Sequence, residues 1–140
     1  MADMSAEDRL EVMDLLARYA DCVDTANVEA YAALFTEDGI VEHSAGTVRG
    51  RDEIRAWVKG LADENRIGPE SRLKHVLGLP VIRGDSQRCT AQTYVLIMRQ
   101  MEGGDISTRL AGTYRDDIVK RDGRWQIEKR VIDLDFVARP

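Results

Sequence analysis

The hydrophobic pattern of this chain changes near residue 73, and that change limits the possible folds more than any other feature. Before it, apolar residues recur every three or four positions, as in amphipathic helices. After it, apolar and polar residues alternate in long stretches rich in β-branched and aromatic side chains, as in strands. Helices followed by a run of long antiparallel strands predict an α+β fold, because alternating βαβ units would intersperse the two patterns.

The first half contains three helical segments and two short strands. Ser5 and Asp8 form a helix-start pattern, and Asn27 can cap a second helix. The expected elements are helices over residues 9–24, 28–35 and 51–61, strands over residues 40–44 and 47–49, and a polar loop over residues 65–72.

The second half contains four expected strands, over residues 73–82, 87–101, 106–120 and 125–136. The dipeptide Asp122-Gly123 between the last two is a strong signal for a tight β-hairpin. Long strands of this kind can curl around the helices. We therefore expect a cavity between the sheet and the helices.

Composition and charge restrict the function classes. A chain of 140 residues fits a single domain, residues 1–140. A net charge of −5 argues against a nucleic-acid-binding face, and no apolar run approaches the ~20 residues of a membrane span. No signal peptide is evident. Cys22 and Cys89 lack metal or redox spacing, so we expect two buried free thiols in a cytoplasmic protein.

Asp24 is a carboxylate at a position where the helical pattern requires an apolar side chain. It lies fourteen residues after Leu10, close to four helical turns, and so continues the same apolar stripe. Burying an unpaired carboxylate costs on the order of several kcal/mol. Asp24 must therefore be neutralised, paired or used in chemistry.

His75 is a suitable partner for Asp24. It alternates in register with Leu73 and Leu77, so on a strand it faces the same apolar side. A neutral imidazole accepts a proton near pH 7, and a carboxylate behind it fixes the tautomer and stabilises the imidazolium. Such a pair can remove a proton from carbon without a metal or cofactor. The alternative is a core histidine bonded to backbone.

Four segments of the chain form a family pattern: DLLARYADCVDTANVEAYAALFTEDGIVEHSAG, VRGRDEIRAWV, LKHVLGLPVI and GTYRDDIVKRDGRWQIEKR. In this order they resemble the SnoaL-like branch of the NTF2-like superfamily, the group of scytalone dehydratase, γ-hexachlorocyclohexane dehydrochlorinase and bile-acid dehydratase. The resemblance implies a cone-shaped α+β barrel, in which a strongly curved, mixed, mainly antiparallel sheet wraps three N-terminal helices around a pocket. The family also holds transport and assembly domains, so the fold alone does not give function.

The resemblance also implies roles for individual residues. Asp24 and His75 match the His-Asp dyad of the dehydratases and the dehydrochlorinase. Tyr19 matches a pocket tyrosine, and His43 matches the position of the base in ketosteroid isomerase. The remaining candidates for substrate binding are Tyr94, Tyr114 and Arg130, of which Arg130 would hold an anionic or leaving group.

Each of these has an ordinary structural alternative. Tyr19 could be a boundary residue with its hydroxyl in water, and His43 a rim or surface histidine. Strand aromatics such as Tyr94 and Tyr114 are more often simple packing. Arg130 shares parity with Glu128, which favours a solvated strand face.

We therefore expect a cofactor-independent lyase or isomerase that acts on a small, mostly apolar ring compound. His75 would be the general base and acid, Asp24 its orienting partner and Tyr19 a contact to a substrate oxygen. One alternative is a non-catalytic ligand-binding or assembly domain, including a role like the small subunit of a ring-hydroxylating dioxygenase. Another is an isomerase or cyclase that uses His43 or Asp133. By resemblance we expect a homodimer or homotrimer, without nucleic-acid or membrane partners.

Overall fold

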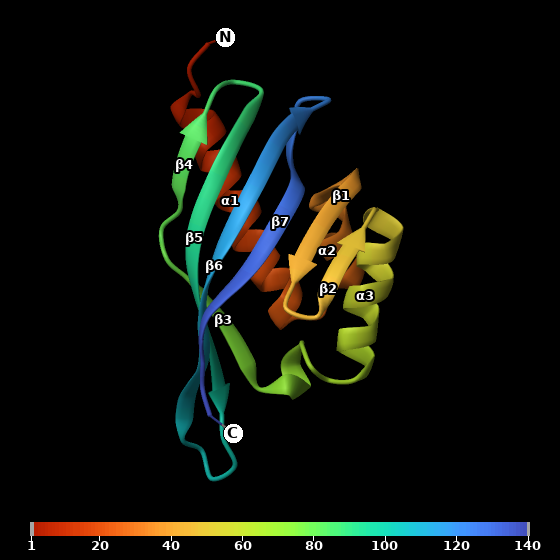
Figure 1. Cartoon of the computed structure of the whole chain (residues 1–140), viewed down its shortest axis with the longest axis vertical. Coiled ribbons are helices and arrows are strands. Elements are labelled where there is room, and N and C mark those ends of the chain that lie inside the picture. Colours follow the sequence, from red (N-terminus) through yellow and green to blue (C-terminus); the bar gives the residue numbers. More distant parts are fainter. Residues whose placement is uncertain (1, 140) are drawn as a thin grey trace.

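The computed structural model describes residues 2–139 and packs three helices against one face of a curved, seven-stranded sheet (Figure 1). The helices are α1 (Ala6–Asp24), α2 (Val28–Ala33) and α3 (Arg51–Asp63), with a short 3-10 turn at Pro69–Ser71. The strands are β1 (Phe35–His43), β2 (Gly46–Arg49), β3 (Leu73–Leu77), β4 (Val81–Gly84), β5 (Arg88–Gln100), β6 (Ile106–Arg121) and β7 (Arg124–Val137).

The strand order is β2-β1-β7-β6-β5-β3, and β4 pairs with the far end of β5. β1 and β7 run parallel, whereas every other described pair is antiparallel. In Figure 1, α1 crosses behind the long strands and α3 lies beside the β1–β2 edge. The predicted fold class, a mixed and mainly antiparallel curved sheet on three helices, is confirmed.

The helix starts follow the capping signals. The hydroxyl of Ser5 accepts a hydrogen bond from the Asp8 amide, and the side chain of Asn27 accepts one from the Ala30 amide. These bonds satisfy amides that have no partner within the first helical turn. Within residues 2–139, no helix is both long and apolar enough to cross a membrane.

The single strand expected over residues 73–82 is wrong, because the structure divides it into β3 and β4. Gly78 still bonds to β5 through its amide, which donates to the Tyr94 carbonyl at 2.8 Å. Pro80 has no amide hydrogen to continue the ladder. The chain therefore leaves the sheet for three residues and rejoins the same strand as β4.

The hairpin between β6 and β7 is confirmed. Asp122 and Gly123 have φ angles of 52° and 76°, which is the left-handed pair that a type I′ turn requires. The turn sets the register of the two longest strands. In that register Asp116 of β6 lies opposite Arg130 of β7.

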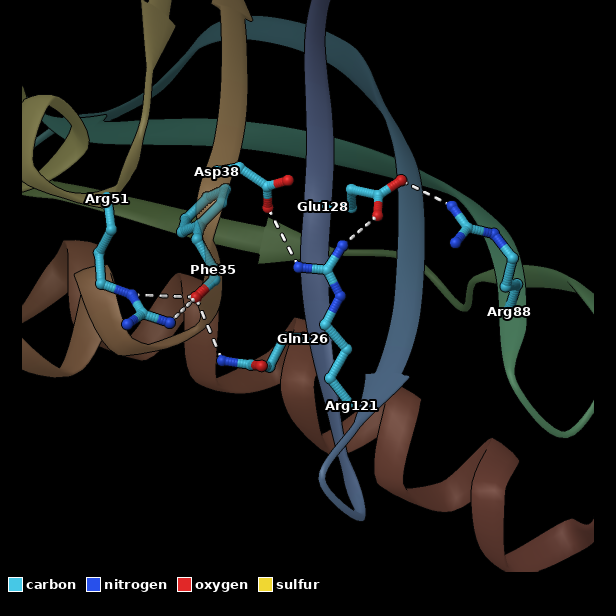
Figure 2. Close-up of polar contacts among 7 residues, drawn as sticks. All are labelled: Phe35, Asp38, Arg51, Arg88, Arg121, Gln126 and Glu128. Carbon is cyan, nitrogen blue, oxygen red and sulfur yellow. Dashed lines mark hydrogen bonds and ion pairs between the residues drawn. The ribbon is translucent and has the colours of Figure 1, made fainter.

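Side chains strengthen the junction where β1 joins β7. The β1–β7 register shifts between Phe35 and Ile40, so the ladder is interrupted there. Figure 2 shows the Phe35 carbonyl accepting hydrogen bonds from the side chains of Arg51 and Gln126, the latter at 3.2 Å. These donors replace ladder bonds that the shift removes.

The core lies between the helices and the inner face of the sheet. Cys22 and Cys89 are both buried there and free, as predicted. Burial raises the pKa of Cys89 to about 12, which keeps it a protonated, unreactive thiol at neutral pH.

Asp8 fastens the start of α1 to the β6–β7 hairpin. Its carboxylate accepts a hydrogen bond from the Trp125 indole at 2.8 Å and one from the Lys120 ammonium at 3.0 Å. These two hydrogen bonds hold the pKa of Asp8 below its ordinary value of 3.8, against the opposing effect of desolvation. The unfolded state therefore binds the proton more readily, and the stabilisation is lost as pH falls through the folded pKa.

Asp8→Asn should therefore lower the melting temperature at pH 7, and the difference from the parent should narrow below about pH 4 as Asp8 itself is protonated. Thermal unfolding followed by circular dichroism at several pH values measures this difference. Asp14→Asn is the control, because Asp14 forms only an exposed pair with Arg18 on the same helix. An Asp8→Asn difference that is equal at pH 7 and pH 3 would contradict the assignment.

Candidate functional site

Asp24 and His75 are in direct contact. Asp24 is the last residue of α1, and His75 is central in β3, the strand that packs against the end of that helix. Asp24 Oδ1 lies 2.7 Å from His75 Nδ1, and both carboxylate oxygens accept the His75 backbone amide, at 3.2 and 3.1 Å. The side chains are 13% and 8% exposed, respectively. The contact predicted from the sequence is present.

This contact sets the tautomer of the neutral His75 ring. An ionised carboxylate only accepts hydrogen bonds, so Nδ1 must carry the hydrogen and Nε2 must carry the free lone pair. Within residues 2–139, no backbone or side-chain group hydrogen-bonds to Nε2. The ring therefore has one nitrogen fixed by a carboxylate and one available as a base.

His75 lines a cavity of about 440 Å³ that also contains the chain's other histidine, His43. This volume suits a small organic ligand. The remaining lining residues are Ser44, Ala45, Trp57, Leu61, Arg66, Ile67, Leu73, Ile97, Arg99, Arg109, Leu110 and Ile132. Most of them are apolar, so the cavity is a hydrophobic space with a few polar groups.

His43 is held in the opposite tautomer. Its ring stacks on Trp57, with the centroids 4.8 Å apart and the planes at 13°. Its Nδ1 lies 3.2 Å from the backbone amide of Ala45 and accepts that hydrogen bond. The neutral ring therefore carries its hydrogen on Nε2. The cavity holds one histidine that can accept a proton and one that can donate a hydrogen bond.

Tyr94 and Asp133 do not belong to this cavity, and their expected roles there are wrong. Tyr94 is 69% exposed and lines a separate hollow with Phe136 on the outer face of the sheet. Asp133 is also absent from the residues that line the cavity; it lies 3.7 Å from the guanidinium of Arg115 and is half exposed. Successive side chains of a strand point to opposite faces of the sheet. Tyr94 and Asp133 occupy positions that point to the outer face, away from the pocket.

Arg130 is wholly buried in the core, so the solvated strand face expected for it is wrong. Its guanidinium makes two hydrogen bonds to Asp116, at 2.6 and 2.8 Å. It lies between two aromatic rings, 3.8 Å from the Tyr19 centroid and 4.0 Å from the Tyr114 centroid. Burial opposes its charge, but the Asp116 carboxylate holds the pKa of Arg130 above its ordinary value.

Tyr19 and Tyr114 are likewise core residues. The Tyr19 hydroxyl accepts a hydrogen bond from Tyr31 at 2.9 Å, so the alternative of a hydroxyl in water is wrong. Burial raises the pKa of Tyr114 above its ordinary value, so Tyr114 is a neutral phenol. Neither tyrosine, nor Arg130, is among the residues that line the histidine cavity.

Sequence reasoning missed Asp116, Arg99 and Arg109. Asp116 had a usable signal: it alternates with Tyr114 and Ile118 and is therefore a polar exception on an apolar strand face, like Asp24 on its helix. The only signal for Arg99 was its position two residues after Ile97, which places both side chains on the same face of the strand. Arg109 had no signal, because it is the extra residue of a β-bulge and its facing does not follow strand alternation.

Known proteins and structures are similar to this chain over most of its length. A family model described as "SnoaL-like domain" matches residues 4–131. Subunit beta 1 of the terminal oxygenase component of terephthalate 1,2-dioxygenase from Comamonas sp. is 26% identical over 91% of each chain. A Nostoc punctiforme protein of unknown function with a cystatin-like fold is 26% identical over 95% of each chain, with a TM-score of 0.84. An NTF2-like protein from Novosphingobium aromaticivorans has a TM-score of 0.82 at 24% identity, over 92% of this chain and 82% of that one.

Proposed function

Because the chain belongs to the SnoaL-like domain family, and because its two histidines share one apolar cavity, we propose that it is a cofactor-independent lyase or isomerase of the dehydratase type. Its substrate would be a small, mostly apolar ring compound. The observation that carries the proposal is the 2.7 Å contact between Asp24 and His75 at the wall of that cavity. A carboxylate-bound histidine with an unbonded ring nitrogen, in the wall of an apolar cavity, is suited to proton transfer.

In the proposed elimination, His75 Nε2 removes a proton from a substrate carbon that a neighbouring carbonyl has made acidic. The electrons of that C–H bond form the new double bond as the C–O bond to a substrate hydroxyl breaks. The departing oxygen takes this proton from the His75 imidazolium and leaves as water, which returns His75 to its neutral form. Asp24 stabilises the imidazolium that forms, and His43 Nε2–H donates a hydrogen bond to a substrate oxygen. In an isomerisation, His75 would return its proton to another carbon.

Asp24→Asn tests whether Asp24 orients and supports His75. The amide keeps the shape of the side chain but cannot neutralise an imidazolium, so we expect turnover to fall by about 10²-fold or more with a modest change in melting temperature. The measurement is water loss from hydroxylated ring ketones, by mass spectrometry, together with thermal unfolding.

Asp21→Asn is the matched control, since Asp21 is an exposed aspartate one turn earlier on α1. Asp21→Asn should change neither turnover nor melting temperature. An Asp24→Asn variant with parental turnover and a lower melting temperature would make Asp24 a structural acid and would refute its orienting role.

A second candidate function is an assembly subunit, and the outer face of the sheet favours it. Large exposed apolar side chains gather there, among them Tyr94, Leu96 and Phe136, around a hollow of about 610 Å³. Contiguous exposed apolar patches often mark protein–protein interfaces. The Comamonas relative is named as a subunit of an oxygenase component. The face would serve a homodimer or homotrimer of this chain, or a larger oxygenase partner.

Tyr94→Glu combined with Phe136→Glu should shift the purified protein from an oligomer to a monomer, because each change places a charge in the apolar contact. Light scattering after size-exclusion chromatography measures the mass. Leu10→Glu, at an exposed apolar position on α1, is the control. A monomeric parent would exclude the self-assembly form, and co-purification with a larger subunit would favour the oxygenase form.

A further inference from the structure

Three arginines line the histidine cavity: Arg66, Arg99 and Arg109. None of the described residues that line it is acidic, although the chain as a whole has a net charge of −5. An acidic protein repels anions in general, so a cationic cavity wall in such a protein is a local exception. The three guanidinium groups place positive charge beside the apolar part of the histidine cavity.

A β-bulge turns Arg109 toward the cavity. Ile97 of β5 pairs with Leu110 of β6, and Met98 pairs with Thr108, so Arg109 is the extra residue between two consecutive pairs. Successive residues of a regular strand face opposite sides, yet Arg109 and Leu110 both line the cavity. Bulges re-aim side chains in this way, frequently beside functional sites.

The two strand arginines have no counter-ion within the described residues. No carboxylate there comes within 4.0 Å of the guanidinium of Arg99 or Arg109, whereas Arg66 lies 3.7 Å from Glu64. Some arginines elsewhere on the sheet are paired, for example Arg121 with Glu128 at 2.9 Å, whereas Arg49, Arg83 and Arg124 form no ion pair with the described residues. Within residues 2–139, the positive charge of Arg99 and Arg109 is therefore not neutralised by a carboxylate.

We infer that the cavity selects a ring compound carrying a carboxylate group, with the carboxylate on Arg99 and Arg109. The planar guanidinium matches a carboxylate in a two-point hydrogen bond, and the ring would lie against Trp57, Ile97 and Leu110. This inference rests on the proposed function only in using the same cavity. It adds a charge requirement to the substrate class.

The test compares binding of 2-naphthoate with binding of its uncharged near-isostere 2-naphthamide, by calorimetry at low salt. We expect the parent to bind the carboxylate about tenfold or more tightly, and Arg99→Gln and Arg109→Gln each to remove most of that preference. Arg115→Gln is the matched control, because Arg115 is an exposed arginine on the outer side of β6. It should keep the preference.

His75→Gln separates this inference from the proposed chemistry. If the variant keeps the preference for 2-naphthoate while no ring compound is turned over by the parent, the charge selection stands and the lyase proposal fails. If the parent binds both probes equally, or neither, or if Arg115→Gln weakens 2-naphthoate as much as Arg109→Gln does, the inference is overturned. That result would leave the lyase proposal intact for neutral rings.

Discussion

His75→Gln is expected to leave the protein folded and to lower turnover by about 10²–10⁴-fold, the usual loss when a general base is removed. The glutamine amide can still donate a hydrogen bond to Asp24, which lies 2.7 Å from the ring nitrogen it replaces. It cannot accept a proton from carbon. Because the contact with Asp24 survives, a large loss of rate would report on proton transfer and not on the fold.

The control for this variant is Lys74→Gln, the preceding residue of the same strand, which is exposed and faces away from the cavity. Both variants should show melting temperatures close to that of the parent, and only His75→Gln should lose turnover. Parental turnover in His75→Gln would make the histidine structural or peripheral. The proposed base would then have to be sought at His43, the other histidine of the cavity.

Most of the fold was predictable because its signals are local. Ser5 and Asn27 cap the helices as expected, and the Asp122-Gly123 turn fixes the longest hairpin. The division between β3 and β4 was not predicted, although Pro80 stands inside the expected strand. Alternation on both sides of Pro80 is consistent with one strand, and only pairing with β5 reveals the break.

The Asp24–His75 contact is present, and the alternation of His75 with Leu73 and Leu77 indicated the side that His75 faces. The apolar stripe used to place Asp24 was wrong, because Leu10 is 65% exposed. Tyr94 was assigned to the cavity without regard to its outward parity with Leu96, and both side chains are exposed. Arg109 was beyond sequence reasoning, because a bulge inserts one residue into the strand and reverses the facing of those beyond it. The alternation of apolar and polar residues in the sequence does not show where a bulge occurs.

A register shift also accounts for the position of Arg130. Parity with Glu128 suggested a solvated face, but the β6–β7 register shifts between Asp117 and Ile118, which changes the facing of residues along that pair. Arg130 instead lies opposite Asp116 on the inner face, under the rings of Tyr19 and Tyr114. The Asp116–Arg130 ion pair is therefore part of the core, and Arg130 does not line the histidine cavity.

Asp116→Asn is accordingly expected to lower the free energy of unfolding by about 3–5 kcal/mol, because it leaves the Arg130 charge buried without a counter-ion. Neither side chain of the pair has any exposed area, so water cannot replace the lost carboxylate. One guanidinium nitrogen, Nη1, already lacks a hydrogen-bond partner within residues 2–139. Urea unfolding at neutral pH measures the change.

Asp117→Asn is the matched control, since Asp117 is the next residue on β6 and is exposed on the outer face. It should change stability by less than about 0.5 kcal/mol. The double variant Asp116→Leu with Arg130→Met removes both charges. Its loss of stability should be far smaller than the summed losses of the single variants Asp116→Leu and Arg130→Met.

If the losses of the two single variants simply add in the double variant, the two residues act independently. The cation held between Tyr19 and Tyr114 would then be stabilised by the aromatic rings alone.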